Sequence, residues 1–352
     1  MEENTAKQES KIKKYLHRYF IDAMSAMAQG LFASLLIGTI ISTLGTQLGI
    51  PVLDEIGGYA KSAAGPAMAV AIGYALQAPP LVLFSLVAVG GAANTLGGAG
   101  GPLAVLVLAI VAAELGWLVS RRTKIDIIVT PLVTIFSGCG LAYLIAPYIG
   151  AAASSVGSLI MWATELQPFL MGIIVSVVVG VALTLPISSA AICAALGLTG
   201  LAGGAAVAGC CAQMIGFAVI SFRENGWGGF FAQGIGTSML QVPNIIKNPR
   251  IWIAPTLASA ITGPIATCVF GLQMNGDAIA SGMGTCGFVG QIGVYTGWLA
   301  DIAAGAKASI TATDWVGLVL ICFILPALLS LVFDLVLRKL NWVKPGDMKL
   351  DI

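Results

Sequence analysis

Charged residues are scarce in this chain of 352 residues, of which Asp, Glu, Lys and Arg make up only 9%. A soluble domain carries roughly 25% charged residues, because its surface must stay hydrated. An ordinary soluble fold is therefore excluded. Disorder is excluded as well, since 58% of the residues are hydrophobic. The formal net charge of +1 provides no field that would attract nucleic acid. A polytopic membrane protein remains.

Residue types that bind metals or carry out catalysis are also few. His17 is the single histidine, and no two of the seven cysteines have the CxxC spacing of a metal or redox site. The chain has no P-loop for ATP hydrolysis, no Ser/His pair and no paired carboxylates. We therefore expect no cofactor and no metal, and we interpret the chain as a transporter or binding protein, not an enzyme.

What the sequence has in abundance is apolar runs, separated by short polar stretches. They predict about ten transmembrane helices in an all-α polytopic membrane protein. The runs cover residues 24–50, 63–78, 80–96, 102–119, 127–149, 168–186, 188–221, 251–272, 279–300 and 315–337. Two further stretches, 229–244 and the glycine-rich 273–298, are too polar for a simple span and too apolar for a loop. They predict re-entrant hairpins or broken helices.

Basic residues gather at both ends of the chain. Residues 1–20 carry five of them and predict a cytoplasmic amphipathic segment, while residues 338–352 carry four and predict a cytoplasmic tail. Residues 21–337 between them are expected to form one transmembrane domain. Both termini on one side of the membrane imply an even number of crossings.

Small and polar residues recur in the same order along the chain. Gly30-xxx-Ser34-xxx-Gly38 matches Gly172-xxx-Ser176-xxx-Gly180, and Ala69, Gly73 and Gln77 match Ala205, Gly209 and Gln213. The matches predict homologous halves at about residues 20–150 and 165–300, with a substrate site where the halves meet. Chance similarity within glycine-rich apolar sequence is the alternative. Whether the halves are parallel or inverted stays open.

Polar side chains within apolar surroundings are the candidate substrate-binding residues, because they are costly in a membrane and their retention indicates function. Arg223, Glu224 and Asn225 lie together in the run SFRENGWGG, where a charged turn between two spans is the alternative. In the first half of the chain, Gln77 and Asn94 are the candidates, and Gln77 precedes Ala78-Pro79-Pro80, where a helix must break.

A second group of candidates follows at nearly helical spacing. Gln233, Thr237, Gln241 and Asn244 are separated by four, four and three residues, which predicts that they share one face of a helix. Amide and hydroxyl groups on such a face suit an uncharged polyhydroxylated solute, with Gln77 and Asn94 opposite. A stripe of hydrogen bonds between helices is the alternative.

Two runs carry a family resemblance: FRENGWGGFFAQGIGTSMLQVPNIIKNPRIWIAP (222–255) and LTLPISSAAICAALGLTGLAGGAA (183–206). They resemble the EIIC sugar permeases of the bacterial phosphotransferase system, in the branch that includes perfringolysin-regulator-like proteins. The resemblance spans most of residues 20–340. It implies a dimeric permease of the bacterial inner membrane that works by alternating access, of elevator type. A separate cytoplasmic phosphotransferase subunit phosphorylates the sugar in typical members.

Two functions follow from these observations. The first is a permease for a small polar solute, a sugar or sugar-like compound by the resemblance. The second is a membrane-embedded sensor or regulator that binds a small ligand without net transport. The sequence lacks the intramembrane histidine common in sugar-transporting members, so the identity of the solute and its coupling to phosphorylation stay open.

Overall fold

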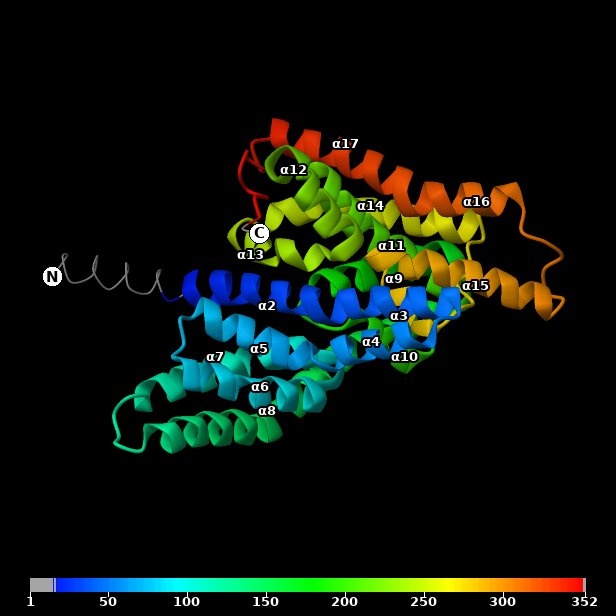
Figure 1. The fold of residues 1–352 in the computed structure, drawn as a ribbon. Coiled ribbons are helices and arrows are strands. Elements are labelled where there is room, and N and C mark those ends of the chain that lie inside the picture. Colours follow the sequence, from blue (N-terminus) through cyan, green and yellow to red (C-terminus); the bar gives the residue numbers. More distant parts are fainter. Residues whose placement is uncertain (1–14, 16, 351–352) are drawn as a thin grey trace. The chain divides into compact units, whose positions relative to one another are not determined.

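The computed structural model describes Tyr15 and residues 17–350, so most of the predicted N-terminal segment, residues 1–20, lies outside the described residues. Within the described part the fold is helical throughout, apart from one isolated antiparallel bridge between Gly200 and Met274 (Figure 1). Six helices are long and apolar enough to cross a membrane: Ala23–Leu48, Pro80–Val119, Asp126–Thr164, Gly200–Ile220, Pro249–Val269 and Ala312–Lys339. The predicted fold class is therefore confirmed, whereas the count of ten spans stays a prediction.

The chain forms two compact units. Unit 1 comprises the residues up to Leu35 and Tyr59–Gly150, and unit 2 comprises Leu36–Gly58 and Ala151–Ile352. The helices α4 (Pro51–Ser62) and α8 (Asp126–Thr164) each begin in one unit and end in the other.

Unit 1 is built from helices that pack on their sequence neighbours: α2 contacts α5, α5 contacts α6, and α6 contacts α7. Its elements are η1 (Arg18–Asp22), α2 (Ala23–Leu31), α5 (Ala64–Ala75), α6 (Pro80–Gly97), η3 (Gly98–Gly100) and α7 (Gly101–Val119). The turn η2 (Phe32–Leu36) leads out of this unit. Helix α5 ends before Gln77, whose φ is 56°, and Pro80 begins α6. The predicted break at Ala78-Pro79-Pro80 is therefore present.

Unit 2 packs around the most buried helix of the fold, α11 (Gly200–Ile220), which contacts α9, α14 and α17. Its other helices are α3 (Ile37–Leu48), α9 (Pro168–Thr184), α10 (Ser189–Leu196), α12 (Phe222–Phe231), α13 (Val242–Lys247), α14 (Ile253–Pro264), α15 (Val289–Ala303), α16 (Ala312–Val319) and α17 (Leu325–Lys339). Short 3-10 or π-helical stretches join or extend them: η4 (Ala232–Gly236), η5 (Ser238–Gln241), η6 (Pro249–Trp252), η7 (Ile265–Val269), η8 (Ala278–Gly282), η9 (Cys286–Phe288) and η10 (Leu320–Ile324).

Two of the predicted segments differ from the structure. The apolar run 188–221 is two helices, because Gly197 and Gly200 both have positive φ and end α10 before α11 begins. The run 127–149 is part of a longer helix, since α8 continues through Pro131 and Pro147 to Thr164. Apolar content alone could not locate either boundary.

The small residues of the sequence pattern lie where helix backbones touch. A Cβ on Gly30 of α2 would approach the carbonyl oxygen of Ala67 on α5 to 2.7 Å. A Cβ on Gly180 of α9 would meet the carbonyl oxygen of Gly209 on α11 at 2.6 Å. Close contact between backbones is how membrane helices associate without a hydrophobic driving force. These small residues therefore allow close helix packing within each unit, and the homology of the two halves stays a prediction.

Candidate functional site

The segment 229–244, predicted to be a re-entrant hairpin or a broken helix, lies in unit 2 and is a broken helix. Helix α12 is kinked at Gly226, whose φ is 58°, and it runs into the short turn η4. Thr237 then has extended backbone, with φ −160° and ψ 141°, before η5 and α13. Because the helix is interrupted at Thr237, the prediction of one continuous helical face is wrong. The role of these residues in binding substrate stays a prediction.

The interruption nevertheless brings three of the predicted amides together. Gln241 Nε2 donates to Gln233 Oε1 at 2.8 Å, and Asn244 Nδ2 donates to Gln241 Oε1 at 2.9 Å. Gln233 Nε2 continues the chain to the Ser221 hydroxyl at 2.9 Å. The side chains of Gln233 and Gln241 are fully buried, and Asn244 is 6% exposed. Thr237 is not part of this chain, since its hydroxyl accepts from Met239 N as a cap of η5.

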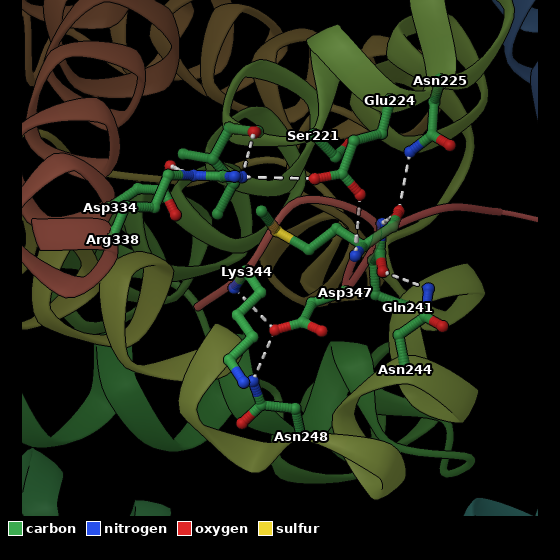
Figure 2. Close-up of polar contacts among 12 residues, drawn as sticks. Ser221, Glu224, Asn225, Gln241, Asn244, Asn248, Asp334, Arg338, Lys344 and Asp347 are labelled. Atoms are coloured by element: carbon green, nitrogen blue, oxygen red, sulfur yellow. Dashed lines mark hydrogen bonds and ion pairs between the residues drawn. The ribbon is translucent and has the colours of Figure 1, made fainter. Parts of the chain in front are cut away.

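The buried amides bind a second segment of the chain, residues 343–350, which we call the tail (Figure 2). Asn225 Nδ2 and Gln241 Nε2 both donate to the carbonyl oxygen of Met348, at 2.8 and 3.0 Å. Asn225 Oδ1 accepts from Leu350 N at 2.8 Å. We call the four side chains that hold the tail the cradle: Glu224, Asn225, Gln241 and Asn244.

Two further bonds complete the contact between cradle and tail. Glu224 Oε2 accepts from Met348 N at 2.9 Å, and Asn244 Nδ2 donates to the carbonyl oxygen of Lys349 at 2.8 Å. The cradle therefore engages main-chain groups of three consecutive tail residues.

An apolar pocket beneath the cradle receives the side chains of the tail. Met348 is fully buried and Val343 is 2% exposed, and both belong to one hydrophobic cluster. The other members of this cluster come from four helices and a turn: Phe217, Ile220, Ile245, Ile251, Ala254 and Leu337. The tail is thus held by main-chain hydrogen bonds and by apolar anchors together.

A group of charges joins the cradle to α17. Arg338 donates from Nε to Asp334 Oδ2 at 2.6 Å and from Nη2 to Glu224 Oε1 at 3.4 Å. The side chains of Asp334 and Glu224 are 6% and 10% exposed. Since buried carboxylates need a partner, Arg338 compensates both of them at once.

Arg338→Ala is expected to lower the free energy of unfolding by about 1–2 kcal/mol, because it leaves two buried carboxylates without their cation. The effect is smaller than for a fully buried pair, since the Arg338 side chain is 26% exposed. Thermal unfolding of the detergent-solubilised protein measures the change. Lys339→Ala removes the same charge from the next residue, which is exposed, and should leave the unfolding midpoint unchanged. Equal midpoints for both variants would contradict the assigned role of Arg338.

In the part of the chain that the structure describes, the remaining candidate residues make no hydrogen bond to this network. Arg223 is exposed and has no hydrogen bond to the cradle among the described residues. Gln77 and Asn94 belong to unit 1, where Gln77 is exposed and lines two cavities of about 470 and 680 Å³. Asn94 is half-buried beside Gly65 and Gly101, and a Cβ on Gly101 would approach its Oδ1 to 2.5 Å.

A second buried polar cluster in unit 2 is centred on Gln213 of α11, which is not among the predicted site residues. Gln213 Oε1 accepts from Trp252 Nε1 at 2.9 Å and from Thr184 Oγ1 at 3.3 Å. Gln213 Nε2 donates to Thr256 Oγ1 at 3.3 Å, and Thr184 contacts the Ser238 hydroxyl at 2.8 Å. The sequence feature that could have identified this cluster is Gln213 itself, a single glutamine inside an otherwise apolar span. A polar side chain at such a position indicates a functional or packing role in a membrane.

A polar cavity of about 430 Å³ lies elsewhere in unit 2, beside the start of α16. Asn275 Nδ2 donates to both carboxylate oxygens of Asp301, at 2.9 and 3.1 Å, and Lys307 pairs with Asp314 at 2.8 Å. Asp314 and Arg338 lie near opposite ends of the span Ala312–Lys339, which is about 42 Å long at 1.5 Å per residue. The cavity and the cradle therefore lie toward opposite ends of unit 2.

Among the described residues no three His, Cys, Asp or Glu side chains gather in a way that could hold a metal ion. The comparison with protein families matches residues 21–350 to the model of the phosphotransferase system EIIC family. The search of curated proteins finds no match.

Proposed function

Because the chain belongs to the phosphotransferase-system EIIC family of sugar-transport membrane permeases, we propose that it moves a sugar or sugar-like solute by alternating access. The observation that carries the proposal is the buried chain of amides in the broken helix of unit 2. Such amides both donate and accept hydrogen bonds, which suits a neutral polyhydroxylated solute. In membrane transporters, broken helices of this kind border the substrate path.

The two ends of unit 2 define a path for the solute. The cavity beside Asp301 and the cradle lie toward opposite ends of one candidate span. A solute that moves between them would cross the membrane. An elevator-type movement is the form of alternating access that we favour, on the basis of the family resemblance.

Charge supports an orientation in which the cradle faces the cytoplasm. Around the cradle lie the cations Arg223, Lys247, Arg250, Arg338, Lys339, Lys344 and Lys349. Cytoplasmic ends of membrane proteins carry such an excess of Lys and Arg. The C-terminal tail is therefore assigned to the cytoplasm of a bacterial cell, where a separate phosphotransferase subunit would act. A homodimer and membership of the perfringolysin-regulator-like branch are further parts of this proposal, which rest on the resemblance.

Uptake of radiolabelled hexoses, hexitols and disaccharides into phosphatidylethanolamine–phosphatidylglycerol vesicles tests the proposal. We expect uptake of at least one of these solutes by the wild-type protein in the absence of any phosphotransferase component. Gln233→Ala should reduce binding of that solute about tenfold, which is the loss of one to two hydrogen bonds. Arg223→Ala should lower it as well, since Arg223 is a predicted substrate-binding residue that directly precedes Glu224 of the cradle.

Gln167→Ala is the matched control, because Gln167 is exposed and precedes α9. Unchanged solute binding in Arg223→Ala, Gln233→Ala and Gln241→Ala would overturn the assignment of these residues. Binding without uptake would identify a membrane-embedded sensor instead of a permease. A permease should largely keep its uptake when residues 1–18 are deleted, whereas a sensor that signals through this segment should lose its response.

A further inference from the structure

The cradle binds main-chain groups of the tail. Its side chains bond to Met348 N, to the carbonyl oxygens of Met348 and Lys349, and to Leu350 N. Along the tail, the side chains of Met348 and Leu350 are buried and that of Lys349 is exposed. Burial thus alternates over these three residues, which lie at the end of the turn formed by residues 345–348. Four polar side chains that together contact main-chain groups of consecutive residues form a peptide-binding site.

The tail is attached in a way that permits release as a unit. It contains turns but no regular helix or strand. Gly346, whose φ is 94°, lies within the turn at residues 345–348. Asp347 adds a side-chain contact between the tail and the rest of unit 2, since its Oδ2 accepts from Asn248 Nδ2 at 2.8 Å. The same oxygen accepts from Lys344 N, within the tail, at 2.8 Å. Detachment would break these contacts and would remove Val343 and Met348 from the hydrophobic cluster, but none of the described helices of unit 2 takes its own main-chain hydrogen bonds from the tail.

The groups that hold the tail are the same groups that the proposed function assigns to the solute. Gln241 and Asn244 direct their amide donors at tail carbonyl oxygens. A cavity of about 290 Å³ borders the contact and is lined by Asn244, Lys247, Asn248, Gly346, Asp347 and Lys349. A solute that entered from this cavity would meet Asn244 and would compete for its hydrogen bonds.

We propose that residues 343–350 are a latch: an intramolecular peptide ligand that occupies the cradle and must leave it before the solute can bind. The proposal rests on the assignment of the cradle to solute binding. It goes beyond that assignment because it makes the C-terminal segment an inhibitor of the permease. A tail that is only a permanent part of the fold is the competing explanation.

The first experiment tests whether the tail binds to the cradle as a separate peptide or is a permanent part of the fold. The chain is truncated after Trp342, and a fluorescent peptide with the sequence of residues 343–352 is added in solution. We expect saturable binding that weakens at least about tenfold when Met348 of the peptide is replaced by Ala, since Met348 is the buried anchor. Replacement of Lys349 by Ala is the control and should change affinity less than about twofold, because its side chain is exposed. Absence of peptide binding to the folded truncated protein would overturn the latch.

The second experiment measures inhibition, with the vesicles and the panel of labelled solutes described above. We expect the truncated protein to take up solute several-fold faster than the full chain, and the peptide to restore the slower rate. The full-length variant Met348→Ala should also be faster. Lys344→Ala should match wild type, because its side chain is exposed and its bond to Asp347 is made by the main-chain N. Met348→Ala therefore tests whether the tail inhibits uptake even if the truncated chain fails to fold.

Unchanged or slower uptake in the truncated chain and in Met348→Ala would show that the tail is a structural element, and the latch would be wrong. Absence of binding and uptake of every solute in all variants is a different outcome, because it would overturn the proposed permease function itself. Peptide binding would still report whether the cradle accepts the tail.

Discussion

Gly209→Ala is expected to lower the free energy of unfolding by about 3 kcal/mol, at the upper end of the usual range for overpacking a core. Gly209 lies on α11, and a Cβ there would overlap the main chain of Ser176 on α9. The Gly209 carbonyl oxygen also accepts from the Ser259 hydroxyl at 3.3 Å. Because the obstacle is backbone, no side-chain rotation relieves the overlap, and α9 and α11 must separate.

Gly140→Ala is the control for this prediction. Gly140 also lies inside a long helix, α8, but a Cβ there meets nothing within 4 Å. Alanine should leave stability unchanged or raise it by up to about 1 kcal/mol, because it has a higher helix propensity than glycine. Unfolding in mixed micelles with increasing dodecyl sulfate measures both variants. Equal destabilisation would contradict the close approach of α9 and α11.

Gln241→Ala is expected to lower stability by about 2–4 kcal/mol and to abolish solute binding. Gln241 lies at the centre of the network: it donates to Gln233 and to the Met348 carbonyl oxygen, and it accepts from Asn244. Its removal leaves three buried polar groups without this partner. Each such group costs roughly 1–3 kcal/mol, and partial rearrangement keeps the total below the sum.

The same unfolding assay and solute binding by calorimetry measure the effect of Gln241→Ala. The exposed Gln167→Ala should match wild type in both assays, since removal of an exposed amide leaves no buried group unpaired. A stability loss with solute binding retained would show that Gln241 only supports the fold. Wild-type stability would contradict the hydrogen-bond network itself.

The fold class followed from composition and apolar runs, and most helix limits came close to their predicted positions. The division of residues 188–221 into α10 and α11 did not follow, because it depends on positive φ at Gly197 and Gly200. In a glycine-rich sequence nothing local distinguishes these two positions from glycines inside a helix, such as Gly209.

The candidate site was predicted in part. Amides at helical spacing pointed to residues 233–244, and three of the four residues do form one network. The predicted helical face was wrong because Thr237 is extended, and a spacing argument assumes an unbroken helix. The contact between the cradle and the tail could not be predicted from residue spacing, since more than 100 residues of chain separate Asn244 from Lys349.

The sequence by itself determined that this protein belongs in a membrane, because a chain with 9% charge and long apolar runs cannot cover a soluble surface. It also determined that unit 2 contains a polar, interrupted segment. Only the tertiary structure decided what those polar groups contact. Hydrogen bonds between Asn225 or Gln241 and the main chain of Met348 depend on packing that joins distant segments. Local periodicity carries no information about such packing, and the apolar pocket that receives Met348 exists only when α11, α13, α14 and α17 come together.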